Sequence, residues 1–133
     1  MTHRQPIRPR PVSSVSQGPS TGDGAFGFNA MEIDTAVRHN LDVVIVIGSD
    51  GVWGIDYHQQ VQLYGRAVAT ELDPVRYDKM AEALGAHGEY VEKPEDIKPA
   101  LERAFASGKP AIINIVTERF AGSVTQNFQP YEH

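Results

Sequence analysis

Two aspartates that stand beside glycines are the residues of this sequence best suited to binding an anion through a metal ion. The tripeptide Gly22-Asp23-Gly24 leads directly into a segment with helical periodicity, so its amides and the helix dipole favour an anion there. Glycine lets a phosphate approach the backbone, whereas the Asp23 carboxylate would repel a bare phosphate unless a cation lay between them. Asp23 therefore suggests a metal ion.

The second aspartate, Asp50, lies 27 residues after Asp23 and follows the apolar run 43–47. The carboxyl ends of parallel strands form the ligand-binding edge of an open α/β sheet, so Asp23 and Asp50 can converge there. Two carboxylates together with diphosphate oxygens suit Mg2+, which prefers six oxygen ligands and few protein groups. Each Asp-Gly pair alone is also a common turn former, and Asp50-Gly51 can equally be a turn between a strand and a helix.

Hydrophobic periodicity predicts the elements that would position these aspartates. Residues 25–40 carry apolar side chains every three or four positions, which indicates one helix. The β-branched run 43–47 predicts a strand covered on both faces, and Gly48, Gly51 and Gly54 mark a loop after it. Further along, the pattern predicts helices at 77–84 and 97–105 and strands at 87–91 and 110–116.

This alternation predicts an α/β fold, a three-layer sandwich with a mostly parallel sheet and helices on both faces. Residues 1–21 hold four prolines and no apolar strand, so we expect the first strand of the sheet to be missing or replaced. The expected organisation is a disordered leader at 1–21, a binding domain at 22–118 and an irregular tail at 119–133.

Composition argues against several functional classes. The sequence contains no cysteine, which excludes disulfides and thiolate metal sites and makes the cytoplasm the expected location. From Gly22 onward there are 9 basic and 17 acidic residues, a balance that disfavours nucleic acid. The longest apolar run has five residues, whereas a membrane-spanning helix needs about 20, so we expect no membrane partner.

Gly22, Gly24 and Gly27 also match the G-x-G-x-x-G fingerprint of dinucleotide-binding modules, with Asp50 as a possible ribose ligand. That motif requires an apolar strand immediately before it, whereas residues 13–19 are polar and interrupted by Pro19. A dinucleotide-binding module therefore remains an alternative, but a weaker one.

A longer stretch carries a family resemblance. The sequence resembles the C-terminal thiamine diphosphate-binding domain of acetolactate synthase-like enzymes over about residues 22–118, through GDGAFGFNAMEIDTAVRHNLDVVIVIGSDGVWGI and RYDKMAEALGAHGEYVEKPEDIKPALERAFASGKPAIINIVTE. The resemblance implies that Mg2+ is bound by the side chains of Asp23 and Asp50 and by the carbonyl of Val52. It also implies cofactor contacts, mainly through backbone groups, from Gly22, Gly24, Ala25, Trp53 and Gly54.

The sequence departs from the family pattern at Ser49-Asp50, where two asparagines are usual, and this adds a negative charge beside an anionic cofactor. The family's reaction is decarboxylation of a 2-oxo acid followed by carboligation. In such enzymes a glutamate of a separate pyrimidine-binding domain assists the cofactor, and no residue here matches it, so no catalytic residue is assigned. We therefore expect a fragment that works in a homo- or hetero-oligomer, or a non-catalytic subunit that docks onto a complete partner.

Overall fold

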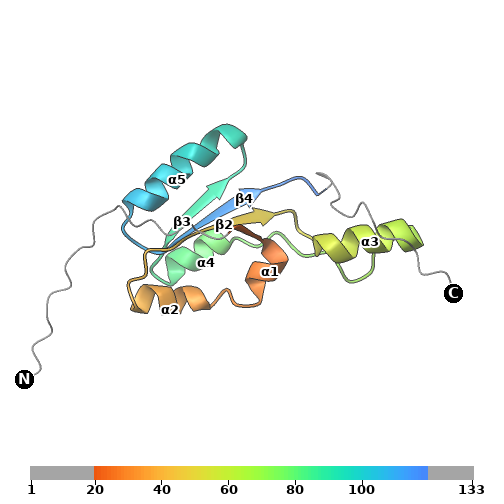
Figure 1. Ribbon diagram of the computed structural model, residues 1–133, viewed down its shortest axis with the longest axis horizontal. Helices are drawn as coiled ribbons and strands as arrows, with labels where there is room; N and C mark the ends of the chain where they lie inside the picture. The colour runs from red at the N-terminus through yellow and green to blue at the C-terminus, as the bar shows by residue number, and fades with distance from the viewer. Residues whose placement is uncertain (1–19, 120–133) are drawn as a thin grey trace, which may run out of the picture.

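Four parallel strands form the centre of the computed structural model, which describes residues 20–119 (Figure 1). They are β1 (Ser20–Gly22), β2 (Val44–Ser49), β3 (His87–Val91) and β4 (Ala111–Val116). The sheet order is β1-β2-β4-β3, so the last strand along the chain lies between β2 and β3. Most of the predicted leader and tail, residues 1–19 and 120–133, lies outside the described residues.

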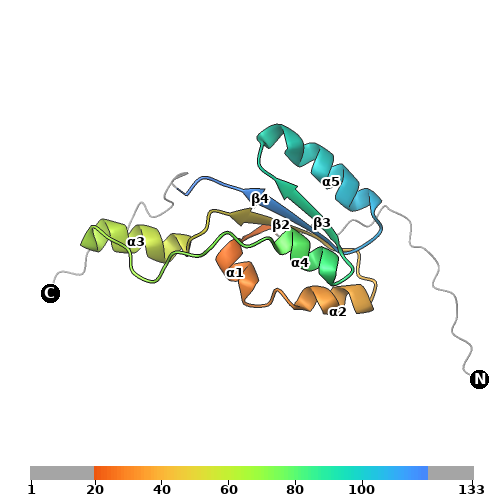
Figure 2. The same cartoon turned by 180° about the vertical axis from the view of Figure 1, so that it is seen from behind.

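Helices cover both faces of the sheet, as the sequence predicts. The helices α1 (Asp23–Gly27), α2 (Glu32–Arg38) and α4 (Tyr77–Ala83) lie on one face, and α5 (Ile97–Ala106) lies on the other, following the 3-10 turn η1 (Pro94–Asp96) (Figures 1 and 2). The expected three-layer α/β sandwich is confirmed. Within the described part of the chain, no helix is long and apolar enough to cross a membrane.

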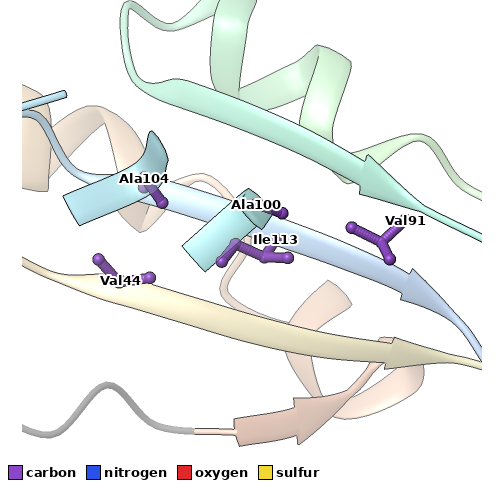
Figure 3. Packing of buried hydrophobic residues seen from close by; sticks show 6 residues of the cluster. Val44, Val91, Ala100, Ala104 and Ile113 are labelled. Carbon is purple, nitrogen blue, oxygen red and sulfur yellow. The ribbon is translucent and has the colours of Figure 1, made fainter. Parts of the chain in front are cut away.

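Alternation along the buried strands divides the core into two clusters. Residues of β2, β3 and β4 that face α5 pack against its alanines, whose small side chains allow the helix to lie close to the sheet (Figure 3). The members of this cluster are Val44, Val91, Ala100, Ala104, Ala111 and Ile113. The alternate residues face the other helices and form the second cluster, which consists of Ile33, Ile47, Ala81, Ala86 and Ile112. The run 110–116 thus contributes side chains to both core clusters, which explains why it is apolar at almost every position.

The boundaries of the later elements agree with the sequence pattern. Gly85, with φ of 92°, follows the end of α4, and Gly108, with φ of 63°, follows α5. Glycine adopts these left-handed conformations without steric cost, so it stops a helix where another residue would be strained.

The single helix predicted at 25–40 is wrong, because the structure contains two short helices separated by turns. Between α1 and α2, hydrogen bonds join residues three apart: Asn29 N donates to Phe26 O at 3.2 Å and Glu32 N to Asn29 O at 2.9 Å. This tighter pattern interrupts the i to i−4 ladder of an α-helix. Apolar periodicity continues across the interruption, because both helices face the same layer of the core.

The expectation of a missing first strand is also corrected. Ser20–Gly22 forms β1, which pairs in parallel with β2 through the register Ser20↔Val46, Thr21↔Ile47 and Gly22↔Gly48. This strand is short, and its ends are exposed, so hydrophobic patterning does not reveal it. A further helix, α3 (Gly54–Tyr64), follows the loop predicted after β2 and contains no buried residue. The periodicity of buried residues that predicts the other helices is therefore absent from it.

Candidate functional site

The candidate site lies where β1 and β2 end side by side. β1 ends at Gly22, which is in register with Gly48 of β2, and β2 ends one residue later at Ser49. Asp23 and Asp50 are the first residues after these two strands. The parallel topology therefore brings both aspartates to the same edge of the sheet, where open α/β sheets bind their ligands.

Asp23 connects the two loops directly. The Asp23 residue is only 6% exposed, and its Oδ1 accepts a hydrogen bond from the backbone N of Gly24 at 2.9 Å. Its Oδ2 accepts a second hydrogen bond from the backbone N of Gly51 at 3.0 Å. A buried carboxylate needs such donors to offset its lost hydration. The residue that begins α1 thus fixes the loop that follows β2.

Asp50 shapes the loop on the other side. Its Oδ1 accepts a hydrogen bond from Val52 N at 3.1 Å, a local bond of the Asx-turn type. Gly51, between them, has φ of 73°, a conformation that favours glycine. Asp50 therefore has a structural role in the turn. Its second carboxylate oxygen, Oδ2, lies 3.8 Å from the position that a Cβ at Gly54 would occupy.

For residues 51–53, the hydrogen bonds within the described chain leave one main-chain acceptor open. Gly51 O accepts a bond from Leu72 N at 2.8 Å, Trp53 N donates to Thr70 O at 2.8 Å, and Trp53 O accepts from Tyr57 N at 2.7 Å. Val52 N is bonded to Asp50, as described above. The Val52 carbonyl accepts no hydrogen bond from any residue that the structure describes, although the Val52 residue is 2% exposed. Buried carbonyls normally have a partner, so this oxygen is available to a ligand.

The remaining predicted contact residues surround this loop. Trp53 lies over Gly24, where an added Cβ would come within 3.0 Å of the indole ring, and its ring centroid is 5.2 Å from that of Phe28. Gly22 and Ala25 are exposed, and Gly54 begins α3. The structure therefore gathers all eight predicted site residues at the carboxyl ends of β1 and β2.

Tyr77 also contacts the site, although the sequence pattern assigns it only to a helix face. Its hydroxyl donates to Asp23 O at 3.4 Å, and its ring meets that of Phe26 edge-on with centroids 4.9 Å apart. Burial, and to a lesser extent the negative charge of Asp23, raise the pKa of Tyr77 above its ordinary value. A Cβ at Gly27 would come within 2.8 Å of this hydroxyl, so Gly27 leaves the space that Tyr77 occupies.

A buried amide supports β2 just before Asp50. Ser49 Oγ donates a short hydrogen bond to Asn114 Oδ1, and Asn114 Nδ2 donates to Val75 O at 3.0 Å. Asn114 is 1% exposed and comes from β4. The sequence holds a signal for it, because Asn114 is the only polar side chain in the apolar run 111–116. A polar side chain inside a buried strand requires partners, which Ser49 and Val75 provide.

The donor set is compatible with Mg2+. Carboxylate and carbonyl oxygens are the ligands that this ion prefers, and it takes few of them from the protein because phosphate and water complete its shell. Among residues 20–119 there is no cluster of three or more His, Cys, Asp or Glu side chains that would hold a metal by itself. An ion here would rely on two carboxylates, one carbonyl and the oxygens of its ligand.

Comparison with known proteins identifies the family of this domain. Residues 19–115 match the family described as thiamine pyrophosphate enzyme, C-terminal TPP binding domain. The chain is 57% identical over 98 residues to a probable acetolactate synthase of Mycobacterium bovis, covering 73% of this chain and 18% of that protein. It is 39% identical over 114 residues to a 2-hydroxyacyl-CoA lyase of Arabidopsis thaliana, covering 81% of this chain and 20% of the relative.

Solved structures show the same fold. A thiamine diphosphate-dependent 4-hydroxybenzoylformate decarboxylase of Rhodococcus jostii RHA1 superposes with a TM-score of 0.70 at 23% identity, over 80% of this chain and 21% of that one. The chain spans about a fifth of the length of the curated relatives that it matches. It belongs to the family of C-terminal TPP-binding domains of thiamine pyrophosphate enzymes.

Proposed function

We propose that this chain binds the diphosphate end of thiamine diphosphate through Mg2+ held by Asp23, Asp50 and the Val52 carbonyl. The observation that carries the proposal is the hydrogen bond of 3.0 Å from Gly51 N to Asp23 Oδ2. This bond holds the two aspartate-bearing loops together before any ligand arrives, and such preorganisation lowers the cost of binding.

The open carbonyl of Val52 supports its assignment as the third ligand. Every other main-chain polar group of residues 51–53 has a partner in the described chain, and this carbonyl has none. A buried carbonyl without a partner costs about 1–3 kcal/mol, and a bound cation would remove that cost. The side chain of Val52 faces the interior, so it packs the loop without contacting the ligand.

Backbone groups around the metal would contact the diphosphate. Gly22 ends β1 and Gly24 and Ala25 follow it, while Trp53 precedes α3 and Gly54 begins it, and the first amides of a helix have no partner within the helix. Glycine at these positions allows oxygen atoms of a phosphate to approach the main chain. The carboxylate at Asp50, where asparagine is usual, adds negative charge, so binding should depend strongly on Mg2+.

The wider activity that we propose is that of an acetolactate synthase-like enzyme acting on a 2-oxo acid. When bound, thiamine diphosphate supplies the electron sink that decarboxylation and carboligation require. The matched relatives are about five times longer than the region shared with this chain. We infer that a pyrimidine-binding domain comes from another part of a homo- or hetero-oligomer, and that the isolated chain binds the cofactor without turnover.

Calorimetric titration of the 133-residue chain with thiamine diphosphate and Mg2+ tests cofactor binding. Asp23→Asn should weaken binding about tenfold or more, because contacts to a charged ligand are worth about 1.5–3 kcal/mol. Asp34→Asn is the matched control, since Asp34 lies on α2 in an exposed ion pair with Arg38 at 2.9 Å. Equal heats for the parent chain and Asp23→Asn, with both folded by circular dichroism, would refute the proposal.

Titration with NAD in the same buffers tests the alternative of a dinucleotide-binding module. That module requires no divalent ion, so heat that is unchanged by a chelator would favour it. The proposal here predicts no heat from NAD and loss of the thiamine diphosphate signal when Mg2+ is chelated.

A second candidate function, a non-catalytic docking subunit, is favoured by the surface of α3. This helix buries none of its residues, and its apolar side chains Ile55 and Tyr64 are 73% and 72% exposed. Exposed apolar side chains grouped on one element favour association with a partner. A chain that sediments as a monomer at all concentrations, alone and with a complete enzyme of this family, would exclude the docking function.

A further inference from the structure

Apart from Gly51, Val52 and Thr70, the segment between β2 and α4 contains no buried residue. Within it, α3 contributes no buried residue and extends beyond the carboxyl ends of the strands (Figure 1). The loop that follows α3 is held partly by α3 itself, because Val68 N donates a hydrogen bond to Gln60 Oε1 at 2.7 Å. Segments with few buried apolar contacts open at a lower free energy than the core, so the order of this segment depends on specific anchors.

One anchor is a short clamp segment (70–72), which pairs with the cofactor loop (50–54). Leu72 N donates to Gly51 O and Trp53 N donates to Thr70 O, both at 2.8 Å, and these bonds form an antiparallel bridge between Val52 and Glu71. The clamp segment therefore holds the main chain on both sides of Val52. Its position decides where the open Val52 carbonyl lies.

One cation, Arg119, lies beside the clamp segment, α3 and the cofactor loop. Arg119 Nη1 forms an ion pair with Glu71 Oε1 at 3.0 Å, in the middle of the clamp segment. The guanidinium carbon lies 5.5 Å from the centroid of the Tyr57 ring in α3, within range of a cation–π contact. Arg119 Nη2 lies 3.7 Å from the position that a Cβ at Gly51 would occupy, so the guanidinium also flanks the cofactor loop.

We propose that Arg119 is a positioning residue for the cofactor site, acting through Glu71 to hold the clamp segment against the cofactor loop. The inference rests on the proposed function, because its effect is read as affinity for Mg2+ and thiamine diphosphate. Arg119 follows β4 and lies outside the residues 19–115 that match the family, so the family resemblance does not assign it this role.

The competing explanation is an ordinary surface ion pair with no bearing on the site. The Glu71 side chain is 68% exposed and that of Arg119 is 34% exposed. Exposed pairs add little to global stability, so both explanations predict nearly unchanged melting temperatures. They differ in what happens locally at residues 51–53 and 70–72.

Amide hydrogen exchange measured by NMR on the full chain gives the first test. Arg119→Gln and Glu71→Gln should each make the Leu72 and Trp53 amides exchange about two- to fivefold faster, which corresponds to the loss of one exposed ion pair. Arg38→Gln removes the comparable exposed pair with Asp34 on α2 and should leave both amides unchanged. Unchanged exchange at Leu72 and Trp53 in both site variants would overturn the inference.

Cofactor affinity gives the second test. Trp53 is the only tryptophan of the chain, so its fluorescence reports directly on the cofactor loop. At saturating thiamine diphosphate, Arg119→Gln should weaken Mg2+ binding about two- to fivefold, and the exchanged pair Arg119→Glu with Glu71→Arg should restore it. If Asp23→Asn weakens binding while Arg119→Gln binds like the parent chain, this inference fails and the proposed function stands. If Asp23→Asn also binds like the parent chain, the proposed function fails.

Discussion

Substitution of Gly88 by alanine should cause a large loss of stability, because Gly88 leaves space for a backbone segment of another element. Gly88 lies in β3, and a Cβ placed there would come within 2.2 Å of the carbonyl oxygen of Asp78 and 2.9 Å of its carbonyl carbon. Both atoms belong to the main chain of α4, which cannot rotate away as a side chain can. Gly88 therefore permits α4 and β3 to lie close together.

The expected magnitude follows from this overlap. Carbon and oxygen atoms rarely approach more closely than about 3.3 Å, so α4 would have to move by about 1 Å from the sheet. Overpacking in a well-packed interior costs about 1–3 kcal/mol and occasionally more, and because this contact involves backbone on both sides we expect a cost of about 4 kcal/mol. The gain of about 0.5–1 kcal/mol from replacing glycine in a strand offsets only part of that cost. We expect a net loss of about 3 kcal/mol.

Urea unfolding and thermal unfolding of the Gly88→Ala variant provide the assay. For a domain of this size, 3 kcal/mol corresponds to a fall of about 12–24 °C in the melting temperature. Gly108→Ala is the matched control, because among residues 20–119 no neighbouring atom lies within 4 Å of its added Cβ and the φ of 63° opposes alanine at a cost of about 1–2 kcal/mol. A Gly88→Ala variant within 1 kcal/mol of the parent chain would refute the reasoning.

Three further predictions concern single residues. Thr70→Val should raise stability by about 1 kcal/mol in thermal unfolding, because Thr70 Oγ1 is buried and has no hydrogen-bond partner among the described residues; a loss would argue for a partner of this hydroxyl. Burial of Asp78 opposes its charge, but the hydrogen bonds and the charge of Arg76 lower the pKa of Asp78. The ionised Asp78 therefore stabilises the fold near neutral pH, and this contribution is lost as the pH falls below about 4 through the folded-state pKa. The stability gap between the parent chain and Asp78→Asn, measured in urea, should therefore shrink from pH 7 to pH 3, and a constant gap would contradict this sign. Gly22→Ala should keep the parent melting temperature, since no atom of the other described residues lies within 4 Å of the added Cβ, but should weaken thiamine diphosphate binding in calorimetry; equal affinity would remove Gly22 from the cofactor contacts.

Much of the layered fold can be predicted from the sequence, because its core elements are recorded in local patterns. The β-branched run 43–47 and the run 110–116 correspond to β2 and β4, and the glycines after 84 and 107 mark helix ends. Each of these signals acts within a few residues. A buried strand must be apolar and a left-handed residue is best provided by glycine, whatever the rest of the chain does.

The missed elements depend on partners that are distant in the sequence. β1 forms because β2 provides a ladder for it, and its own three residues carry no apolar signal. The turns between α1 and α2 accompany the insertion of Tyr77 beside Gly27, a contact between residues 50 positions apart. No periodicity within residues 25–40 can report such a contact.

The residues of the site also divide into those that a sequence pattern predicts and those that depend on distant partners. The convergence of the loops that carry Asp23 and Asp50 follows from parallel topology and could be predicted. The contacts of Leu72 and Thr70 with the cofactor loop, and the ion pair of Arg119 with Glu71, come from irregular segments, which have no spacing rule. Asn114 lies between these cases. Its polar side chain inside an apolar run predicts a buried hydrogen-bonding residue, but nothing in the sequence predicts that Ser49 is its partner.

The position of β4 has a consequence for synthesis of the chain on the ribosome. β4 comes last among the described elements, yet it pairs with both β2 and β3. Until residues 111–116 leave the exit tunnel, β2 and β3 have no common neighbour, and both core clusters lack the members that β4 contributes, Ala111, Ile112 and Ile113. Non-local parallel pairing is slow to form, and unpaired strand edges favour aggregation. The nascent chain should therefore stay bound to holding chaperones until β4 emerges, and a ribosome stalled before residue 111 should present a chain without a stable sheet.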